Sequence, residues 1–60
     1  MPLLDYSLGD FVTHSERPDW GVGQVQSIEG MRITVNFEHV GKQLINAEII
    51  FLIPVAAETK

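Results

Sequence analysis

Apolar and polar residues alternate at every position from residue 31 to residue 37, MRITVNF. A period of two is typical of a β-strand that has one buried face and one solvent-exposed face. The pattern therefore predicts a strand whose side chains divide between a core and the solvent. The inward residues are predicted to be Met31, Ile33, Val35 and Phe37, and the outward residues Arg32, Thr34 and Asn36.

A partner strand is predicted over residues 23–28, GQVQSI, and Glu29 and Gly30 join it to the strand over residues 31–37. Gly30 can adopt the positive φ that a tight hairpin requires. A β-hairpin is therefore the predicted centre of the chain. Before it, Gly21 and Gly23 lie two residues apart at the entry to a strand, which predicts a bulge or a sharp bend.

Shorter strands are predicted over residues 11–14, 42–45 and 51–53. The polar segment 15–19 contains a proline, which cannot donate to a strand ladder, and is predicted to be a loop. Asn46 is expected to cap a single helical or 3₁₀ turn over the three residues that follow it. The chain should therefore contain five short strands, one such turn and tight links.

Short strands at near-regular spacing with glycine-rich turns predict an all-β fold, either a small barrel or a sandwich. The chain divides into an N-terminal arm over residues 1–8, the barrel over 9–54 and a frayed tail over 55–60. Sixty residues without cysteine must be stabilised by packing alone or by a partner that completes the core, so the stability should be marginal. The predicted core consists of Val25, Ile33, Val35, Phe37, Leu44 and Leu52.

The chain carries eight acidic and four basic residues, a formal charge of −4. Proteins that bind nucleic acids usually present a basic stripe that neutralises phosphates, and an acidic surface opposes that approach. The charge favours solubility, or a basic patch on a protein partner. No basic leader and no apolar run of about 20 residues is present, so the protein is expected to be soluble and cytoplasmic, with no membrane contact.

Catalysis finds no support in the sequence, and the protein is expected not to be an enzyme. The chain has no cysteine and no glycine-flanked serine, and it shows no pair of carboxylates with a pocket that would shift their pKa. Its histidines, His14 and His39, are too far apart in sequence to resemble a pair of metal ligands. We expect them to form surface hydrogen bonds, and we predict no metal and no cofactor.

Three segments together form a recognisable pattern: residues 9–14 (GDFVTH), 20–25 (WGVGQV) and 35–37 (VNF). The pattern resembles bacterial Tudor-like (SH3-like) barrels. Among these are the C-terminal domain of UvrD/PcrA-type helicases and the RNA-polymerase-interacting domain of CarD and the transcription-repair coupling factor. The nearest resemblance is to a family of stand-alone bacterial proteins of similar length, a domain of unknown function. The resemblance covers residues 8–54.

The resemblance implies a small five-stranded, strongly bent antiparallel barrel of the SH3-like type. It also implies a non-catalytic protein-interaction module, because the helicase and CarD relatives dock on RNA polymerase through an exposed strand edge. We therefore expect an accessory of transcription or DNA repair. Because fold does not fix function, a nucleic-acid-binding small barrel stays open as the alternative.

Candidate contacts with a protein partner lie at the Trp20 end of the hairpin and on its outward row. Exposed tryptophans are enriched at binding hot spots, although the interpretation that the sequence favours is that the ring of Trp20 caps one end of the barrel. For the polar row, the default interpretation is an ordinary solvated face. The candidate partner-binding residues are Trp20, Arg32, Thr34, Asn36, His39 and Lys42.

Two other modes of binding stay open at this point. The nucleic-acid alternative requires Arg17, Arg32 and Lys42 to converge on one face, with Trp20 as a platform for base stacking. Homo-oligomerisation through an open strand edge is a further alternative, since small barrels with exposed edges can pair. The sequence does not decide the oligomeric state.

Overall fold

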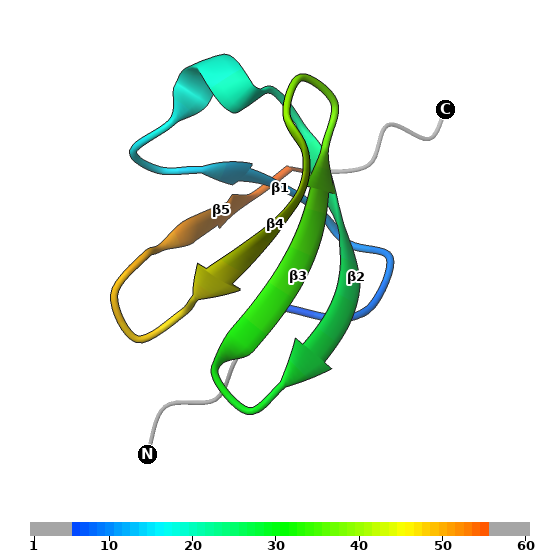
Figure 1. The fold of residues 1–60 in the computed structure, drawn as a ribbon, viewed down its shortest axis with the longest axis vertical. Coiled ribbons are helices and arrows are strands. Elements are labelled where there is room, and N and C mark those ends of the chain that lie inside the picture. The colour runs from blue at the N-terminus through cyan, green and yellow to red at the C-terminus, as the bar shows by residue number, and fades with distance from the viewer. Residues whose placement is uncertain (1–5, 56–60) are drawn as a thin grey trace.

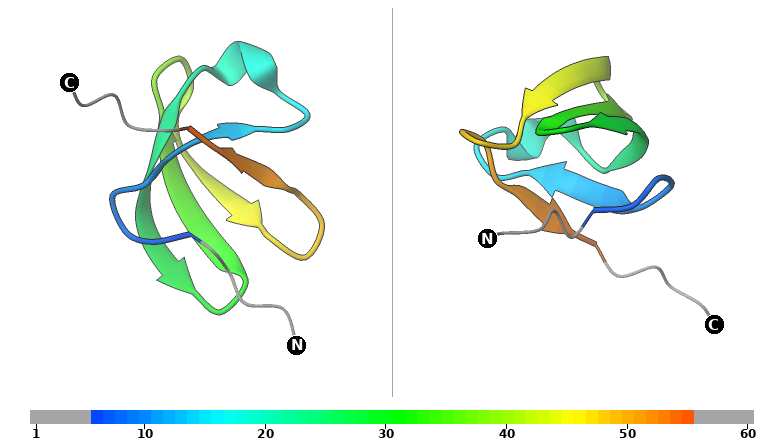
Figure 2. Two further views of the ribbon diagram at one scale, coloured as in Figure 1. Left: turned by 180° about the vertical axis from the view of Figure 1, so that it is seen from behind. Right: turned by 90° about the horizontal axis from the view of Figure 1, so that it is seen from below.

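The computed structural model describes residues 6–55, which form one antiparallel sheet of five strands. Its strand order is β4-β3-β2-β1-β5, so β4 and β5 are the edge strands. The view from below in Figure 2 shows β3 and β4 lying over β1 and β5, so that the sheet folds over on itself (Figures 1 and 2). The elements are β1 (Phe11–His14), the 3₁₀ helix η1 (Pro18–Trp20), β2 (Gly23–Glu29), β3 (Arg32–Phe37), β4 (Gly41–Asn46) and β5 (Leu52–Pro54).

The all-β fold of five antiparallel strands is confirmed, and each predicted strand agrees with an observed one to within about one residue at either end. The sheet is strongly bent but open, because β4 and β5 are not neighbours in it. Within residues 6–55, no helix is long and apolar enough to cross a membrane. Residues 56–60 of the predicted tail and residues 1–5 of the predicted N-terminal arm lie outside the described residues.

The core fills the space between the two halves of the folded sheet. Phe37 is the largest of its fully buried side chains, and the inward and outward faces predicted for residues 32–37 are confirmed. Met31, which was also predicted to point inward, is only half-buried and lies just before the strand. Gly23 lies directly beneath Phe37: a Cβ there would come within 2.7 Å of the phenyl ring. The buried hydrophobic side chains are Val12, Val25, Ile33, Val35, Phe37, Ile45 and Leu52.

The prediction that Leu44 belongs to the core is wrong: its side chain is 65% exposed, and Ile45 is buried instead. The reason is the register of β4. Leu44 lies opposite Thr34, and Ile45 lies opposite Ile33. Since cross-strand partners share a face of the sheet, Leu44 follows Thr34 to the outside and Ile45 follows Ile33 into the core.

The single 3₁₀ helix is not at the predicted place. It occupies Pro18–Trp20, within and just after the segment predicted to be a loop, with Pro18 at its first position, where a missing N–H is harmless. Asn46 does cap a turn as predicted: its Oδ1 accepts the N–H of Glu48 at 2.9 Å, and its C=O accepts the N–H of Ile50 at 2.9 Å. That turn does not continue into a helix.

The ladder between β2 and β3 has its bulge between Val25 and Ser27, not at Gly21 and Gly23 as predicted. Gly21 takes a φ of 81° where the chain leaves η1, so the predicted bend occurs there. In the hairpin, Gly30 has a φ of 61° and stands first of the two residues between the paired Glu29 and Arg32. That position favours glycine in a type II′ turn.

The free edge of β5 is closed by Tyr6. Its hydroxyl donates to the C=O of Leu52 at 3.0 Å and accepts the N–H of Leu52 at 3.3 Å. Val55 donates its N–H to Phe11, so Leu52 and Pro54 are the residues whose backbone groups point away from β1. Pro54 has no N–H, so this edge offers few free groups to another strand.

Replacement of Phe37 by alanine is expected to destabilise the domain by about 3–5 kcal/mol, because it leaves a cavity in the middle of the core. A domain of this size has little more than that in reserve. Thermal and urea unfolding measure the effect. The control is Phe51→Ala, which removes a phenyl ring that is 65% exposed. Equal stability of the two variants would contradict the assignment of Phe37 to the core.

Replacement of Tyr6 by phenylalanine is expected to destabilise the fold by about 1 kcal/mol, because both hydrogen bonds to Leu52 are lost. The ring itself stays and keeps its packing against the core. Gln24→Ala serves as the control, since it removes an exposed side-chain hydrogen bond to Gly9. Urea unfolding midpoints that do not differ between Tyr6→Phe and the control would show that the β5 edge does not depend on the hydroxyl.

Candidate functional site

The outward side chains of β2, β3 and β4 form a continuous surface, which we call the outer face. The register places cross-strand partners side by side in rows that run across the three strands. Four candidate residues lie on this face: Arg32, Thr34 and Asn36, which were predicted to point outward, and Lys42, for which no orientation was predicted. The rows are Gln24–Asn36–Lys42, Ser27–Thr34–Leu44 and Glu29–Arg32–Asn46.

The outer face is polar, with one apolar side chain at its edge. Leu44 is the exception, and it stands beside Lys42 on the last strand. Among residues 6–55, the ion pair joins Glu38 and His39. Within the same range, neither Arg32 nor Lys42 has a carboxylate within ion-pair distance. Both cations are therefore available to a partner.

A shallow hollow of about 300 Å³ lies at the hairpin end of the outer face. Glu29, Met31, Arg32, Asn46 and Glu48 line it. The hollow is open to solvent rather than enclosed, and its charged groups are the carboxylates of Glu29 and Glu48 and the guanidinium of Arg32. Within the described part of the chain, no three histidine, cysteine or acidic residues lie close enough to hold a metal ion.

The free edge of β4 is the second feature of this surface. Ala47 donates its N–H to the C=O of Met31 at 2.8 Å, which makes residues 31 and 47 a hydrogen-bonded pair. Bonded and non-bonded pairs alternate along an antiparallel ladder. The N–H and C=O groups of Lys42 and Leu44 therefore point away from β3, toward the open side of the sheet. Unlike β5, this edge has neither a proline nor a side-chain hydroxyl bound to it within residues 6–55.

Trp20 does not share the outer face. Its ring packs edge-to-face against Phe37, with centroids 5.2 Å apart, and against His14 at 4.8 Å. Because Phe37 points into the core, the ring of Trp20 covers the core at the η1 end. This is the cap that the sequence offered as the alternative to a contact residue.

His14 is buried, contrary to the surface position predicted for it. Only 6% of it is exposed, and its Nδ1 accepts the backbone N–H of Glu16 at 3.0 Å. This bond and the edge contact with Trp20 satisfy the imidazole inside the aromatic cluster. The residue therefore anchors the loop after β1 to the core, and it is not available to a ligand.

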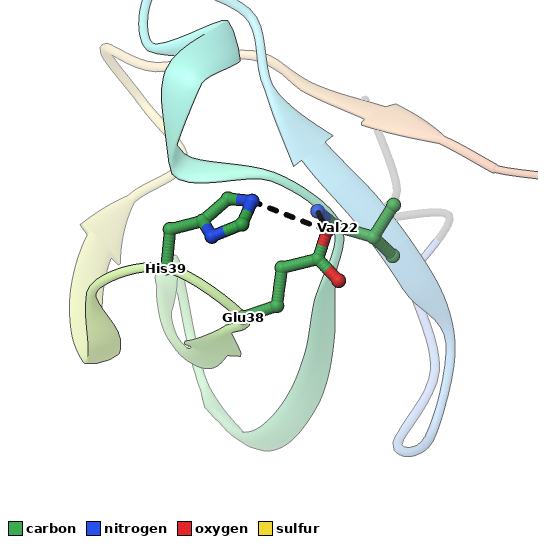
Figure 3. Close-up of polar contacts among 3 residues, drawn as sticks. All are labelled: Val22, Glu38 and His39. Atoms are coloured by element: carbon green, nitrogen blue, oxygen red, sulfur yellow. Dashed lines mark hydrogen bonds and ion pairs between the residues drawn. The ribbon is translucent and has the colours of Figure 1, made fainter.

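His39 lies in the turn between β3 and β4, away from the rows of the outer face. Its Nε2 is 3.6 Å from Oε2 of Glu38, and the same carboxylate oxygen accepts the N–H of Val22 at 3.4 Å (Figure 3). The two side chains fold over the backbone of Gly21, where a Cβ would meet them at 2.5 Å. The pair secures the turn against the start of β2. Both side chains stay more than half exposed.

The outer face was predictable from the sequence, but the outward position of Leu44 and the free backbone groups of β4 were not. The neighbouring apolar residues Leu44 and Ile45 were the signal for an outward leucine, since only one of two adjacent strand residues can face the core. No local sequence pattern indicates the free edge, because such a pattern does not reveal the order of the strands in the sheet.

Comparisons with known proteins place the chain in a family. Neither the curated proteins nor the solved structures contain a significant match. Residues 7–55 match the family described as "Protein of unknown function (DUF3553)", and this range contains every strand of the sheet. Because the match spans more than half of the chain, the protein belongs to the DUF3553 family.

Proposed function

We propose that the protein is a non-catalytic protein-interaction module that docks a partner along β4 and the adjoining outer face. The observation that carries this proposal is the edge of β4, where the N–H and C=O groups of Lys42 and Leu44 have no partner within residues 6–55. An extended segment of another protein can add to such an edge as a further strand. Its backbone would supply affinity, and Lys42, Asn36 and Thr34 would supply side-chain contacts.

RNA polymerase is the partner we propose for this edge. The support is the resemblance of the chain to the C-terminal domain of UvrD/PcrA-type helicases and to CarD, which dock on the polymerase through an exposed strand edge. This chain has such an edge. The protein would then act in the cytoplasm as an accessory of transcription or DNA repair.

The nucleic-acid alternative gains no support from the placement of its residues. Trp20 is committed to the aromatic cluster with His14 and Phe37, so its ring is not a free stacking platform. Arg17 lies in the loop before η1, and only Arg32 and Lys42 share the outer face. Two cations on a chain of charge −4 make a weak phosphate-binding surface.

Affinity capture with the tagged protein from a bacterial lysate tests the proposal, with polymerase subunits quantified by mass spectrometry. We expect enrichment of these subunits and at least a tenfold loss in Leu44→Glu, which places a charge on the docking edge. Phe51→Glu is the matched control, since it places the same charge on an equally exposed apolar residue next to β5.

Capture without any enrichment of polymerase subunits would reject the polymerase as partner. Equal capture by both variants would reject β4 as the docking edge. If the protein instead binds single- or double-stranded DNA with an affinity that falls steeply as salt rises, the nucleic-acid alternative replaces the proposal.

A further inference from the structure

We infer that β4 also pairs with β4 of a second copy of the chain, in a two-fold antiparallel arrangement that joins two sheets into one. This inference does not depend on the proposed function. It starts from the contrast between the two edges of the sheet: Tyr6 and Pro54 close the edge at β5, and nothing in residues 6–55 closes the edge at β4. Natural proteins usually protect both edges, so an open one indicates a strand that is meant to be covered.

The charged side chains around β4 can pair with those of a second copy of the same strand. Residues 40–47 contain no carboxylate, so two acidic chains can approach along β4 with little repulsion. Lys42 lies at the start of β4, and Glu48 lies just after its end. When two such strands run antiparallel, Lys42 of each copy comes to the end where Glu48 of the other copy stands. The same pair of contacts therefore forms twice, as a two-fold interface requires.

The position of Leu44 selects the register. Pairing about a two-fold axis at Leu44 places this residue opposite its own copy, and it places Lys42 opposite Asn46 of the second copy. Glu48 then follows two residues beyond Asn46, within reach of the long lysine side chain. The leucine is 65% exposed on an otherwise polar face, and the pairing buries it. Parallel pairing would instead bring the two Lys42 side chains together.

Lysine on an edge strand normally opposes edge-to-edge association, because its charge would be left without a partner. Here Glu48 of the second copy supplies that partner, so Lys42 selects this one register and disfavours others. Self-pairing and the docking of another protein use the same backbone groups of β4. The two states are therefore mutually exclusive, and self-pairing would hold the docking edge covered.

Sedimentation velocity over a range of protein concentrations tests the inference. The wild-type protein is expected to show a reversible equilibrium between monomer and dimer. Lys42→Glu should weaken the dimer at least tenfold, because it places like charges at both ends of the paired strands. The double variant Lys42→Glu/Glu48→Lys should restore the dimer to within about threefold of the wild type, because the swapped charges are again complementary.

The matched control is Arg17→Glu, which changes the net charge by the same amount at an exposed position away from β4. Circular dichroism of each variant verifies that it is folded. A strict monomer at millimolar concentration would overturn the inference. So would equal weakening by Arg17→Glu and Lys42→Glu, or a double variant that stays as weak as the single one. None of these results depends on whether polymerase is captured.

Discussion

The phenyl ring of Phe37 and the bare backbone of Gly23 beneath it set the geometry on which this domain depends. The ring fills the middle of a core that no disulfide supports, and no helix within residues 6–55 is longer than one turn. Trp20 and His14 close over the ring at the η1 end. Because Gly23 has no side chain, the ring can approach the β2 backbone closely, so the two halves of the sheet enclose the core without helices.

The face of each residue in β3 was predictable from the alternation alone, and with it the outer-face positions Arg32, Thr34 and Asn36. Leu44 was not, because residues 44 and 45 are both apolar and only the register with β3 separates them. The bonds between Tyr6 and Leu52 join residues 46 positions apart, which no local pattern reveals. His14 was misplaced for a similar reason: its partners, Trp20 and Phe37, come from other elements.

The two edges of the sheet connect this fold to its proposed role. A small open sheet must either satisfy or expose the outward backbone groups of its last strands. At β5 a tyrosine hydroxyl and a proline remove them, whereas at β4 the groups of Lys42 and Leu44 have no partner in the described part of the chain. The proposed docking and self-pairing would both use these groups of β4, so they would compete for the same strand.

Amide hydrogen exchange, followed residue by residue by NMR in a dilute sample of the protein, tests most directly whether β4 is an open edge. If β4 is an open edge, the rate of amide exchange should alternate between slow and rapid along this strand. The N–H groups of Gln43 and Ile45, which are bonded to β3, should exchange slowly, and those of Lys42 and Leu44 should exchange rapidly. The N–H of Leu52, held by Tyr6, should be protected at the other edge. Uniform protection along β4 in the dilute monomer would show that its edge is already covered, and it would contradict the assignment of β4 as an open edge.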